Sequence, residues 1–377
     1  MPLFPLPPSQ RAGAGDLDAQ ARILDAVPAL RRILDALPTM AMVLNRQRQL
    51  VLANHRLIEF ASTTGIDDLC GFRPGEILHC GHALDSPEGC GSTEHCTVCG
   101  ALQAIVTAQF GLAQNQLCRL QLRTPSGDQP LELDISASPI EIGGEQFTIV
   151  CASDAAGRLE RERLEHSAVP QAVELALEME ILATSIASPG APPEARERAT
   201  EHMAAASRRI ATLMREHAEL ASAETGGLSV ARRSVSALEI LRDTAREFEY
   251  HPAAAGRRIR IASDAPDATL DTDPALARHA MEKIVLNALE ATAPGGVVEV
   301  GCRLAAGRME FWVRNDGQMP RDVQLQVFQR AFSTKGRGRG YGTYFAKLIA
   351  ERYLNGTLSF RSTAEEGTTF CVSLPLT

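Results

Sequence analysis

Four short segments near the C-terminal end constrain this chain more than any other feature. Residues 280–292 repeat apolar side chains at helical spacing, which predicts a helix. Asn287 lies on that helix, and its amide oxygen would be a hard ligand of the kind that Mg²⁺ prefers. An apolar run at 309–313 predicts a strand that ends before Asp316. The other two segments are the aromatic run 328–335 and the glycine-rich run 338–343.

Together these segments predict a nucleotide site. A carboxylate in a dry pocket beyond a strand, such as Asp316, can accept a hydrogen bond from the exocyclic amine of adenine. Alternating glycines before a helix-like run at 344–353 let backbone N–H groups approach phosphates at a helix N-terminus. A glycine-rich run alone describes a flexible loop equally well. The prediction therefore depends on all four segments and their order.

In this order the segments resemble the ATP-binding domain of sensor histidine kinases and of the wider family that includes gyrase, the Hsp90 chaperones and MutL. The resemblance covers residues 234–377 and implies a Bergerat-type α/β sandwich that binds ATP and Mg²⁺. It implies that Asn287 is the N-box ligand of Mg²⁺ and that Asp316-Gly317 is the adenine-binding first glycine box. The other nucleotide contacts that it implies are Phe328 and Phe332 of the F-box, the loop cations Lys335 and Arg339, and Gly338, Gly340, Gly342 and Thr343 of the second glycine box.

The chain departs from the family pattern at two places, and neither removes a group that the metal or the base needs. Lys283 stands where many kinases carry an additional asparagine, one helical turn before Asn287. Gln318-Met319-Pro320 stands where many relatives carry a further glycine. Lys335 and Arg339 also have a simpler interpretation, as solvated loop cations that balance no phosphate.

The composition excludes several other classes of protein. A length of 377 residues predicts two or three domains, and 45% hydrophobic residues suffice for packed cores. A net charge of −8 argues against a nucleic-acid-binding surface. No apolar run is long enough to predict a membrane span, and the proline-broken N-terminus is not a signal peptide. We therefore expect a cytoplasmic protein with reduced cysteines.

The N-terminal part of the chain predicts a small sensor. Residues 1–35 are assigned to an N-terminal tail and helix. The tail is expected to be disordered to about residue 18, and helical spacing runs from residue 19 to 37. In the stretch 36–154, short strands are predicted at 40–44 and 50–53, followed by small helices and a strand-rich region at 111–152 with a turn at Gly143-Gly144. This pattern resembles a PAS sensor domain. The alternative is another small α+β domain.

The middle of the chain predicts a helical hairpin. Residues 155–222 lack aromatic side chains and are rich in Ala, Leu, Glu and Arg, which favours long helices. Prolines and a glycine at 188–193 break them into two arms. With one apolar stripe per arm, such a hairpin must pair with a second copy, as in the dimerisation and phosphotransfer element that the resemblance implies. Residues 225–227 then form a hinge to the catalytic domain, 223–377.

His166 on the first arm is the candidate phosphoacceptor. A neutral, solvent-facing imidazole there could attack the γ-phosphorus in line. Relatives carry an acidic residue directly after this histidine and an asparagine or threonine four residues on, whereas this chain has Ser167 and Pro170. The alternative is that His166 is an ordinary exposed histidine and that the chain is a degenerate, non-catalytic ATP-binding regulator that works by partner contact.

Four cysteines crowd into a short stretch of the expected sensor: Cys80, Cys90, Cys96 and Cys99. Glycines beside them would relieve the turns needed for the thiolates to converge, and a Cys-x2-Cys pair is a common bidentate grip. The spacing fits neither the paired zinc pattern nor the usual ferredoxin runs, so structural zinc, an iron–sulfur cluster and unligated thiols all stay open. The other cysteines are expected to be buried small hydrophobes.

The complete expectation is a homodimeric sensor histidine kinase of a two-component system. A cysteine-rich PAS-like sensor would control ATP-dependent phosphorylation of His166 and transfer to an aspartate on a response regulator. The fold class is α+β and multidomain. The sequence does not indicate the stimulus, the cognate regulator or the direction of switching.

Overall fold

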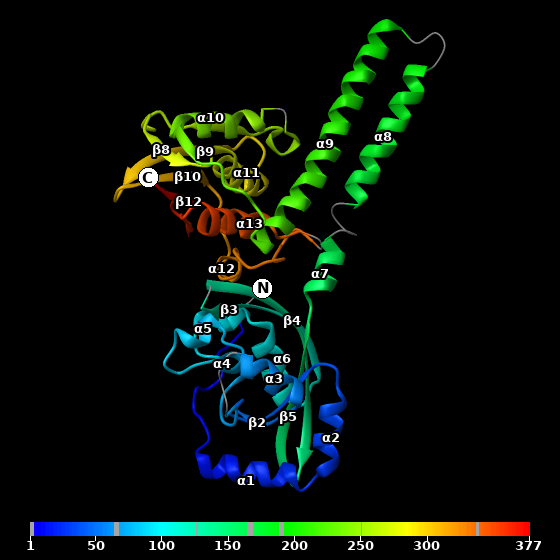
Figure 1. Cartoon of the computed structure of the whole chain (residues 1–377), viewed down its shortest axis with the longest axis vertical. Coiled ribbons are helices and arrows are strands. Elements are labelled where there is room, and N and C mark those ends of the chain that lie inside the picture. Colours follow the sequence, from blue (N-terminus) through cyan, green and yellow to red (C-terminus); the bar gives the residue numbers. More distant parts are fainter. Residues whose placement is uncertain are drawn as a thin grey trace. The chain divides into compact units, whose positions relative to one another are not determined.

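The computed structural model describes residues 4–63, 68–125, 127–163, 169–187, 192–249, 251–336 and 339–377. The chain divides into two compact units, residues 1–159 and 160–377 (Figure 1).

The first unit is built on a five-stranded antiparallel sheet in the order β2-β1-β5-β4-β3. Its strands are β1 (Met40–Leu44), β2 (Leu50–Ala53), β3 (Gln114–Thr124), β4 (Gly127–Ile142) and β5 (Glu145–Asp154). The helical segments are α1 (Ala14–Asp25), α2 (Pro28–Ala36), α3 (His55–Thr63), α4 (Pro74–Ile77), α5 (Gly81–Leu84), η1 (Glu94–Val98) and α6 (Gly100–Gln109). The predicted strands at 40–44 and 50–53 and the Gly143-Gly144 turn are confirmed.

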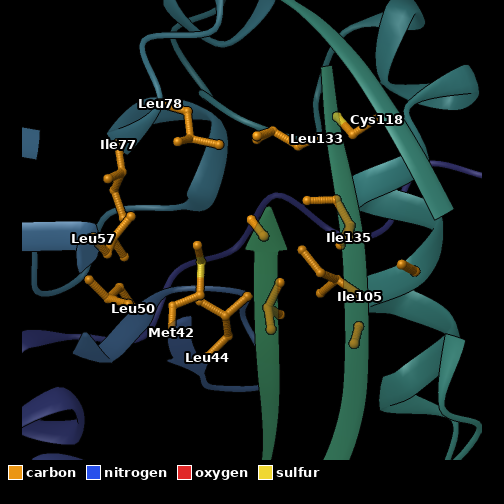
Figure 2. Close-up of a cluster of buried hydrophobic side chains, with 14 of the residues drawn as sticks. Met42, Leu44, Leu50, Leu57, Ile77, Leu78, Ile105, Cys118, Leu133 and Ile135 are labelled. Atoms are coloured by element: carbon orange, nitrogen blue, oxygen red, sulfur yellow. The ribbon is translucent and has the colours of Figure 1, made fainter. Parts of the chain in front are cut away.

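Strand β1 is buried on both faces, which explains why its sequence is a continuous apolar run. Met42 and Leu44 point into the core that Ile105 of α6, Leu133 and Ile135 also form (Figure 2). The alternate side chains, Ala41 and Val43, join a second core with Leu24 of α1 and Leu34 of α2. The period-two geometry of the strand thus divides one apolar run between two cores.

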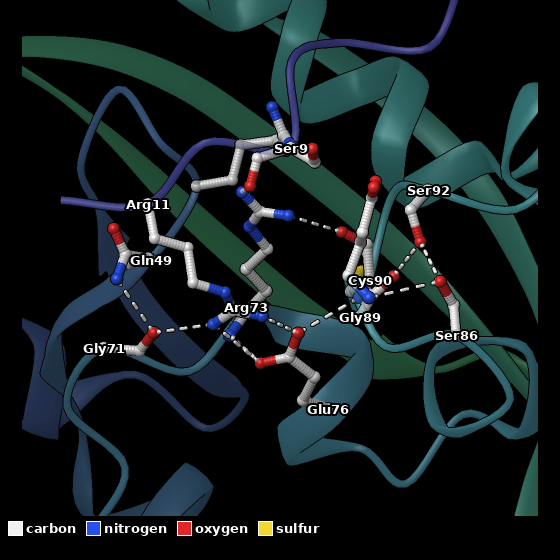
Figure 3. Close-up of polar contacts among 12 residues, drawn as sticks. Ser9, Arg11, Gln49, Gly71, Arg73, Glu76, Ser86, Gly89, Cys90 and Ser92 are labelled. Atoms are coloured by element: carbon white, nitrogen blue, oxygen red, sulfur yellow. Dashed lines mark hydrogen bonds and ion pairs between the residues drawn. The ribbon is translucent and has the colours of Figure 1, made fainter.

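Two expectations for the N-terminal residues are wrong. The helix predicted over 19–37 is two helices, because Pro28 occupies the first turn of α2 and Val27 leaves the helical conformation. The tail is placed against the first unit from residue 4 onward, and α1 already begins at Ala14. The fully buried guanidinium of Arg73 donates to the backbone carbonyls of Ser9 and Gln10 at 2.8 and 3.0 Å (Figure 3). The sequence pattern could not predict these contacts, because every residue carries a backbone carbonyl that can accept a hydrogen bond.

The second unit begins with a helical hairpin. Helix α7 (Ala156–Arg163) spans the boundary between the units, and α8 (Val169–Ala187) lies beside α9 (Pro193–Thr225) (Figure 1). Helix α9 runs past residue 222 and ends at Gly226, whose φ of +81° is the left-handed conformation that terminates a helix. The predicted hinge therefore contains a real helix terminator.

The rest of the second unit is an α/β sandwich. Its sheet has the order β11-β12-β10-β9-β7, with β7 parallel to β9 and the other neighbours antiparallel. Helices α10, α11 and α13 pack on this domain (Figure 1). The elements are β6 (Arg233–Ser236), α10 (Ala237–Glu247), η3 (Pro252–Ala254), β7 (Arg258–Ile261), β8 (Thr269–Thr272), α11 (Pro274–Ala291), β9 (Val297–Ala305), β10 (Arg308–Asn315), α12 (Arg321–Gln324), α13 (Gly342–Leu348), the π-helical η4 (Ile349–Tyr353), β11 (Thr357–Thr363) and β12 (Gly367–Pro375).

Among the described helices, none combines the length and the apolar character needed to cross a membrane.

Candidate functional site

Helix α11 positions Asn287. The helix starts cleanly because the Asp273 carboxylate accepts hydrogen bonds from the backbone N–H groups of Ala275 and Leu276, with Pro274 in the first turn. Ile284 and Ala288 are buried on the side that faces the domain, and Asn287 itself is half-buried. The predicted helix is confirmed, and it places the amide of Asn287 in its last turn.

Asp316 follows β10, as predicted, but its surroundings differ from the expectation. The side chain is exposed and not in a dry pocket, whereas its neighbour Asn315 is buried. In the described part of the chain, Asp316 makes no side-chain hydrogen bond or ion pair. A bound base would itself have to exclude water from this carboxylate.

Two residues that the sequence did not single out hold the turn after Asp316. Thr368 donates its hydroxyl to the carbonyl of Gly317 at 2.6 Å. Ser362 accepts from the backbone N–H of Met319 at 2.7 Å, and the two hydroxyls lie 2.8 Å apart. They meet because Ser362 of β11 is directly opposite Thr368 of β12. No local motif signals this pair, since it depends on strand register.

The two F-box phenylalanines occupy different environments. Phe328 packs against Phe360 and Phe370 of the sheet, with ring centroids 5.6 and 6.1 Å apart, and the Lys347 ammonium lies 5.0 Å from its ring centroid. Phe328 is half-buried, and these contacts place its ring beside the aromatic side chains of the sheet. Phe332 is half-buried, and its backbone lies against the glycine-rich loop at Gly340.

The second glycine box contains glycines with different constraints. Gly340 has a φ of +98°, and a Cβ there would lie 2.2 Å from the carbonyl oxygen of Phe332. Gly342 begins α13, and the Thr343 hydroxyl donates to the Val327 carbonyl. Thr343 thus ties the start of α13 to the F-box segment. Gly338 lies outside the described residues.

Lys335 and Arg339 meet α11 at Glu290. The Lys335 ammonium forms an ion pair with one carboxylate oxygen of Glu290 and lies 3.4 Å from the Asn287 Oδ1 atom. Arg339 lies 3.8 Å from the other Glu290 oxygen. The structure therefore brings together three of the predicted site residues, Asn287, Lys335 and Arg339. Glu290 stands within the segment that the sequence singled out, but no role was predicted for it.

The end of α9 is fastened to the C-terminal α/β domain. The buried Arg330 of the F-box segment forms an ion pair with Glu224, with Nε and Oε1 2.6 Å apart. The Tyr353 hydroxyl donates to the carbonyl of Ala223 at 2.7 Å, and Arg352 donates to the carbonyl of Glu224 at 3.0 Å. The guanidinium of Arg330 also lies 5.6 Å from the ring centroid of Tyr341 in the glycine-rich loop. Contacts thus run continuously from the hairpin to that loop.

The proposed phosphoacceptor, His166, and Ser167 lie outside the described residues. Pro170 is the second residue of α8, in the first turn, where a proline removes no hydrogen bond within the helix.

The four clustered cysteines lie in one region of the first unit, around α4, α5 and α6. Burial, with a smaller contribution from the neighbouring Cys99 and Cys96, raises the pKa of the Cys80 thiol to about 11. Burial likewise raises the pKa of Cys90, with added repulsion from Cys99, Cys96 and Cys80. Across the described ranges, however, no three Cys, His, Asp or Glu side chains are arranged to hold a metal ion. The predicted metal centre is not seen in this arrangement.

Two neighbours of these thiols were not expected. Cys118, which the sequence suggested is an isolated buried residue, places its sulfur 3.9 Å from that of Cys99. The buried Arg48 guanidinium also lies near the thiols of Cys90 and Cys96. Its burial and, to a smaller extent, repulsion from Arg73 lower its pKa to about 10, whereas these two cysteines act in the opposite direction. Arg48 donates to the Pro8 carbonyl at 2.9 Å, and none of the described carboxylates lies in ion-pair range of it.

The comparison with protein families decides what the C-terminal domain is. Residues 272–377 match the family described as "Histidine kinase-, DNA gyrase B-, and HSP90-like ATPase". This region is an ATPase domain of that family. The match includes Asn287, Asp316, the F-box phenylalanines and the glycine-rich loop, so the recognition made from the sequence is confirmed for this domain.

The chain is also similar to two curated proteins with sensor names. It is 29% identical to the sensor-like histidine kinase SenX3 of Mycolicibacterium smegmatis, over 52% of this chain and 53% of that protein. It is 24% identical to the heme sensor protein HssS of Staphylococcus aureus, over 36% of this chain and 30% of that protein. The chain thus spans about half the length, or less, of these curated relatives.

Among solved structures, the chain is similar to the histidine kinase ThkA in complex with the response regulator protein TrrA. The identity is 16% and the TM-score 0.37, over 92% of this chain and 98% of that one. The isolated catalytic domain of ThkA matches at 22% identity and a TM-score of 0.36, over 39% of this chain and 96% of that one.

Proposed function

We propose that this chain is a protein histidine kinase of a two-component system. It would bind ATP with Mg²⁺ in the C-terminal domain, phosphorylate His166 and pass the phosphoryl group to an aspartate of a response regulator. The observation that carries this proposal is that a matched ATPase domain brings Asn287, Lys335 and Arg339 to one place beside the glycine-rich loop. The chain's similarity to the named sensor-like histidine kinase SenX3 supports the histidine as acceptor.

The proposed roles follow from charge and geometry. Mg²⁺ would take the Asn287 oxygen and keep its phosphate ligands, while Lys335 and Arg339 would balance the phosphate charge. Asp316 would accept the hydrogen bond of the adenine amine. A neutral His166 nitrogen would then attack the γ-phosphorus as the bond to the ADP oxygen breaks, so that catalysis is mostly positioning and electrostatic stabilisation.

His166→Ala is expected to abolish autophosphorylation, because it removes the attacking nitrogen. Ser167→Glu should raise the rate by at least about tenfold, because a well-placed general base is typically worth roughly 10²–10⁴-fold and the chain lacks an acid at that position. The measurement is transfer of radiolabel from γ-labelled ATP to the full chain, with acid-labile and base-stable phosphate expected. His202→Ala, an exposed histidine on α9, is the matched control and should not change the rate.

The possible outcomes separate the kinase from its alternative. Phosphate that persists in His166→Ala would move the acceptor elsewhere. Wild type and Ser167→Glu that both stay unlabelled while still binding ATP would indicate a non-catalytic regulator. That alternative rests on Ser167 and Pro170, which replace the residues that align the histidine and support dephosphorylation in relatives. For the same reason we expect little phosphatase activity toward a regulator.

As part of the proposal, the chain works as a cytoplasmic homodimer through its helical hairpin. Val173, Leu177 and Ile181 of α8 are 50, 54 and 71% exposed. Their spacing of four residues places them on one side of the helix. An exposed apolar stripe of this kind on a two-helix hairpin is what a four-helix dimer would bury.

The first unit is proposed to be a PAS-like sensor whose input is the cysteine-rich region. The strand order β2-β1-β5-β4-β3 and the helices between β2 and β3 support the assignment of a PAS-like domain. The role of the cysteine-rich region is supported by the closeness of its buried thiols, whose thiolate forms would repel one another without a bound cation, and by the buried Arg48, which lacks a described carboxylate partner. Thiolates bound to a metal would supply the missing negative charge, provided that the side chains rotate toward one another.

Anaerobically purified protein is therefore expected to contain about one thiolate-bound metal centre per chain. Elemental analysis is the measurement, and visible absorption bleached by oxygen would select an iron–sulfur cluster over zinc. Cys96→Ser and Cys99→Ser should each lose the metal, because a closed four-ligand site rarely survives with three ligands. Cys371→Ser, in the other unit, is the matched control. If the wild-type protein contains no metal above background, the four cysteines are unligated thiols.

A further inference from the structure

Glu290 lies where two loop cations and the proposed metal ligand meet. It follows Asn287 by three residues in the last turn of α11, so both side chains project from the same side of the helix. Its two carboxylate oxygens are divided between Lys335 and Arg339. The Lys335 ammonium is within 3.4 Å of the Asn287 oxygen at the same time. An ammonium group therefore already contacts the atom, Asn287 Oδ1, that the proposed function assigns to Mg²⁺.

These contacts compete with those of a bound nucleotide. The Asn287 oxygen that would bind Mg²⁺ already contacts the Lys335 ammonium. The positive charge that would meet phosphate is already paired with Glu290, whose side chain is about 32% exposed beside that of Lys335 at 35%. An ion pair with this exposure is weak enough for a polyphosphate to displace. The same pair still costs free energy to break, and a nucleotide without its metal must provide that free energy alone.

We propose that Glu290 is a positioning residue that holds Lys335 against the Asn287 oxygen until the phosphates of a magnesium nucleotide draw the lysine away. The proposal rests on the proposed function, which assigns Mg²⁺ to Asn287 and phosphate to Lys335. Once the lysine moves to phosphate, the Asn287 oxygen is free for the metal. Phosphate and metal therefore help each other to bind, and this coupling is reciprocal by linkage.

The test is the affinity of the full-length protein for ATP, measured by calorimetry in excess Mg²⁺ and in EDTA. In EDTA, Glu290→Gln should bind ATP about three- to tenfold more tightly than wild type, because the phosphates no longer compete with a carboxylate for Lys335. In excess Mg²⁺ its affinity should stay within about twofold of wild type, because the carboxylate that Lys335 leaves then lies one helical turn from the cation at Asn287, and its attraction to that cation offsets the cost of breaking the pair. The dissociation constant in EDTA divided by that in excess Mg²⁺ should therefore be smaller for Glu290→Gln than for wild type. A merely structural role of Glu290 would leave this ratio unchanged.

Two further variants decide whether the effect passes through Lys335. When Lys335 is replaced by Met, the Glu290→Gln substitution should tighten ATP binding in EDTA by less. The change in the logarithm of the dissociation constant should be at most half of that seen with Lys335 present. Glu310→Gln is the matched control, since it breaks an ion pair with Arg303 (2.8 Å) on the β9–β10 hairpin. It should leave both affinities unchanged.

The proposal is overturned if Glu290→Gln binds metal-free ATP no more tightly than wild type, or if its gain is unaffected by Lys335→Met. A wild-type protein that binds ATP in neither condition would instead refute the proposed function, and the positioning role with it. Normal magnesium-dependent binding together with an unchanged ratio in Glu290→Gln would refute only the positioning role.

Discussion

Asp316→Ala is expected to lower ATP affinity at least tenfold. The substitution removes the base-specific hydrogen bond of the proposed site, and a bond to a charged group is worth about 1.5–3 kcal/mol. Asp316 is exposed and has no side-chain partner in the described part of the chain, so its removal should not destabilise the domain. We therefore expect a loss of affinity with a melting temperature close to that of wild type.

Calorimetric titration with ATP and a thermal melt are the measurements. Asp264→Ala, an exposed acid after β7, is the matched control for the loss of one negative charge and should change neither quantity. An Asp316→Ala protein with wild-type ATP affinity would show that the adenine contact is assigned to the wrong residue. A large fall in melting temperature would indicate that Asp316 stabilises the fold.

Gly340→Ala is expected to destabilise the ATP-binding domain by more than about 2 kcal/mol and to abolish ATP binding. A side chain in the left-handed region costs roughly 1–2 kcal/mol by itself. At this position the new Cβ would also lie 2.2 Å from the Phe332 carbonyl oxygen and 2.8 Å from its nitrogen. These are backbone atoms, which cannot rotate away, so the segment that carries Phe332 and Lys335 must shift.

Gly307→Ala separates the conformational cost of a left-handed alanine from the steric clash of its Cβ. Gly307 has a φ of +72° but nothing within 4 Å of the position of its Cβ, in the turn between β9 and β10. It should lose only the conformational part, about 1 kcal/mol, and keep its ATP affinity. Urea unfolding and ATP titration of both variants are the measurements. If the two variants prove equally stable and both bind ATP normally, the close packing of Gly340 on Phe332 is not needed for the site.

Much of the site could be predicted from the sequence because its signals are local. The helix of Asn287 and the strand before Asp316 are confirmed, since apolar periodicity follows directly from the geometry of one element. The strands at 40–44 and 50–53 are confirmed for the same reason. The expected helix over 19–37 failed at Pro28, where a local backbone constraint outweighs apolar spacing.

Contacts between distant segments could not be predicted. Thr368 reaches the turn after Asp316 through strand register, and Arg330 reaches Glu224 across 106 residues of sequence. The N-terminal segment is placed because its carbonyls accept hydrogen bonds from the buried arginines Arg48 and Arg73, and any residue type can supply a carbonyl. Such contacts have no periodicity along the chain.

The sequence alone determined the helix that carries Asn287, the strand before Asp316 and the candidate residues of the proposed nucleotide site, because helix and strand periods and backbone-permissive glycines are properties of neighbouring residues. Only the tertiary structure decided which of these residues meet. It packed Phe328 against the aromatic side chains of the sheet, left Asp316 exposed and paired Glu290 with Lys335 and Arg339 beside Asn287. The physical reason is that the packing of α11 against the loop, and not the spacing of residues along the chain, sets which charges lie within a few ångströms of one another.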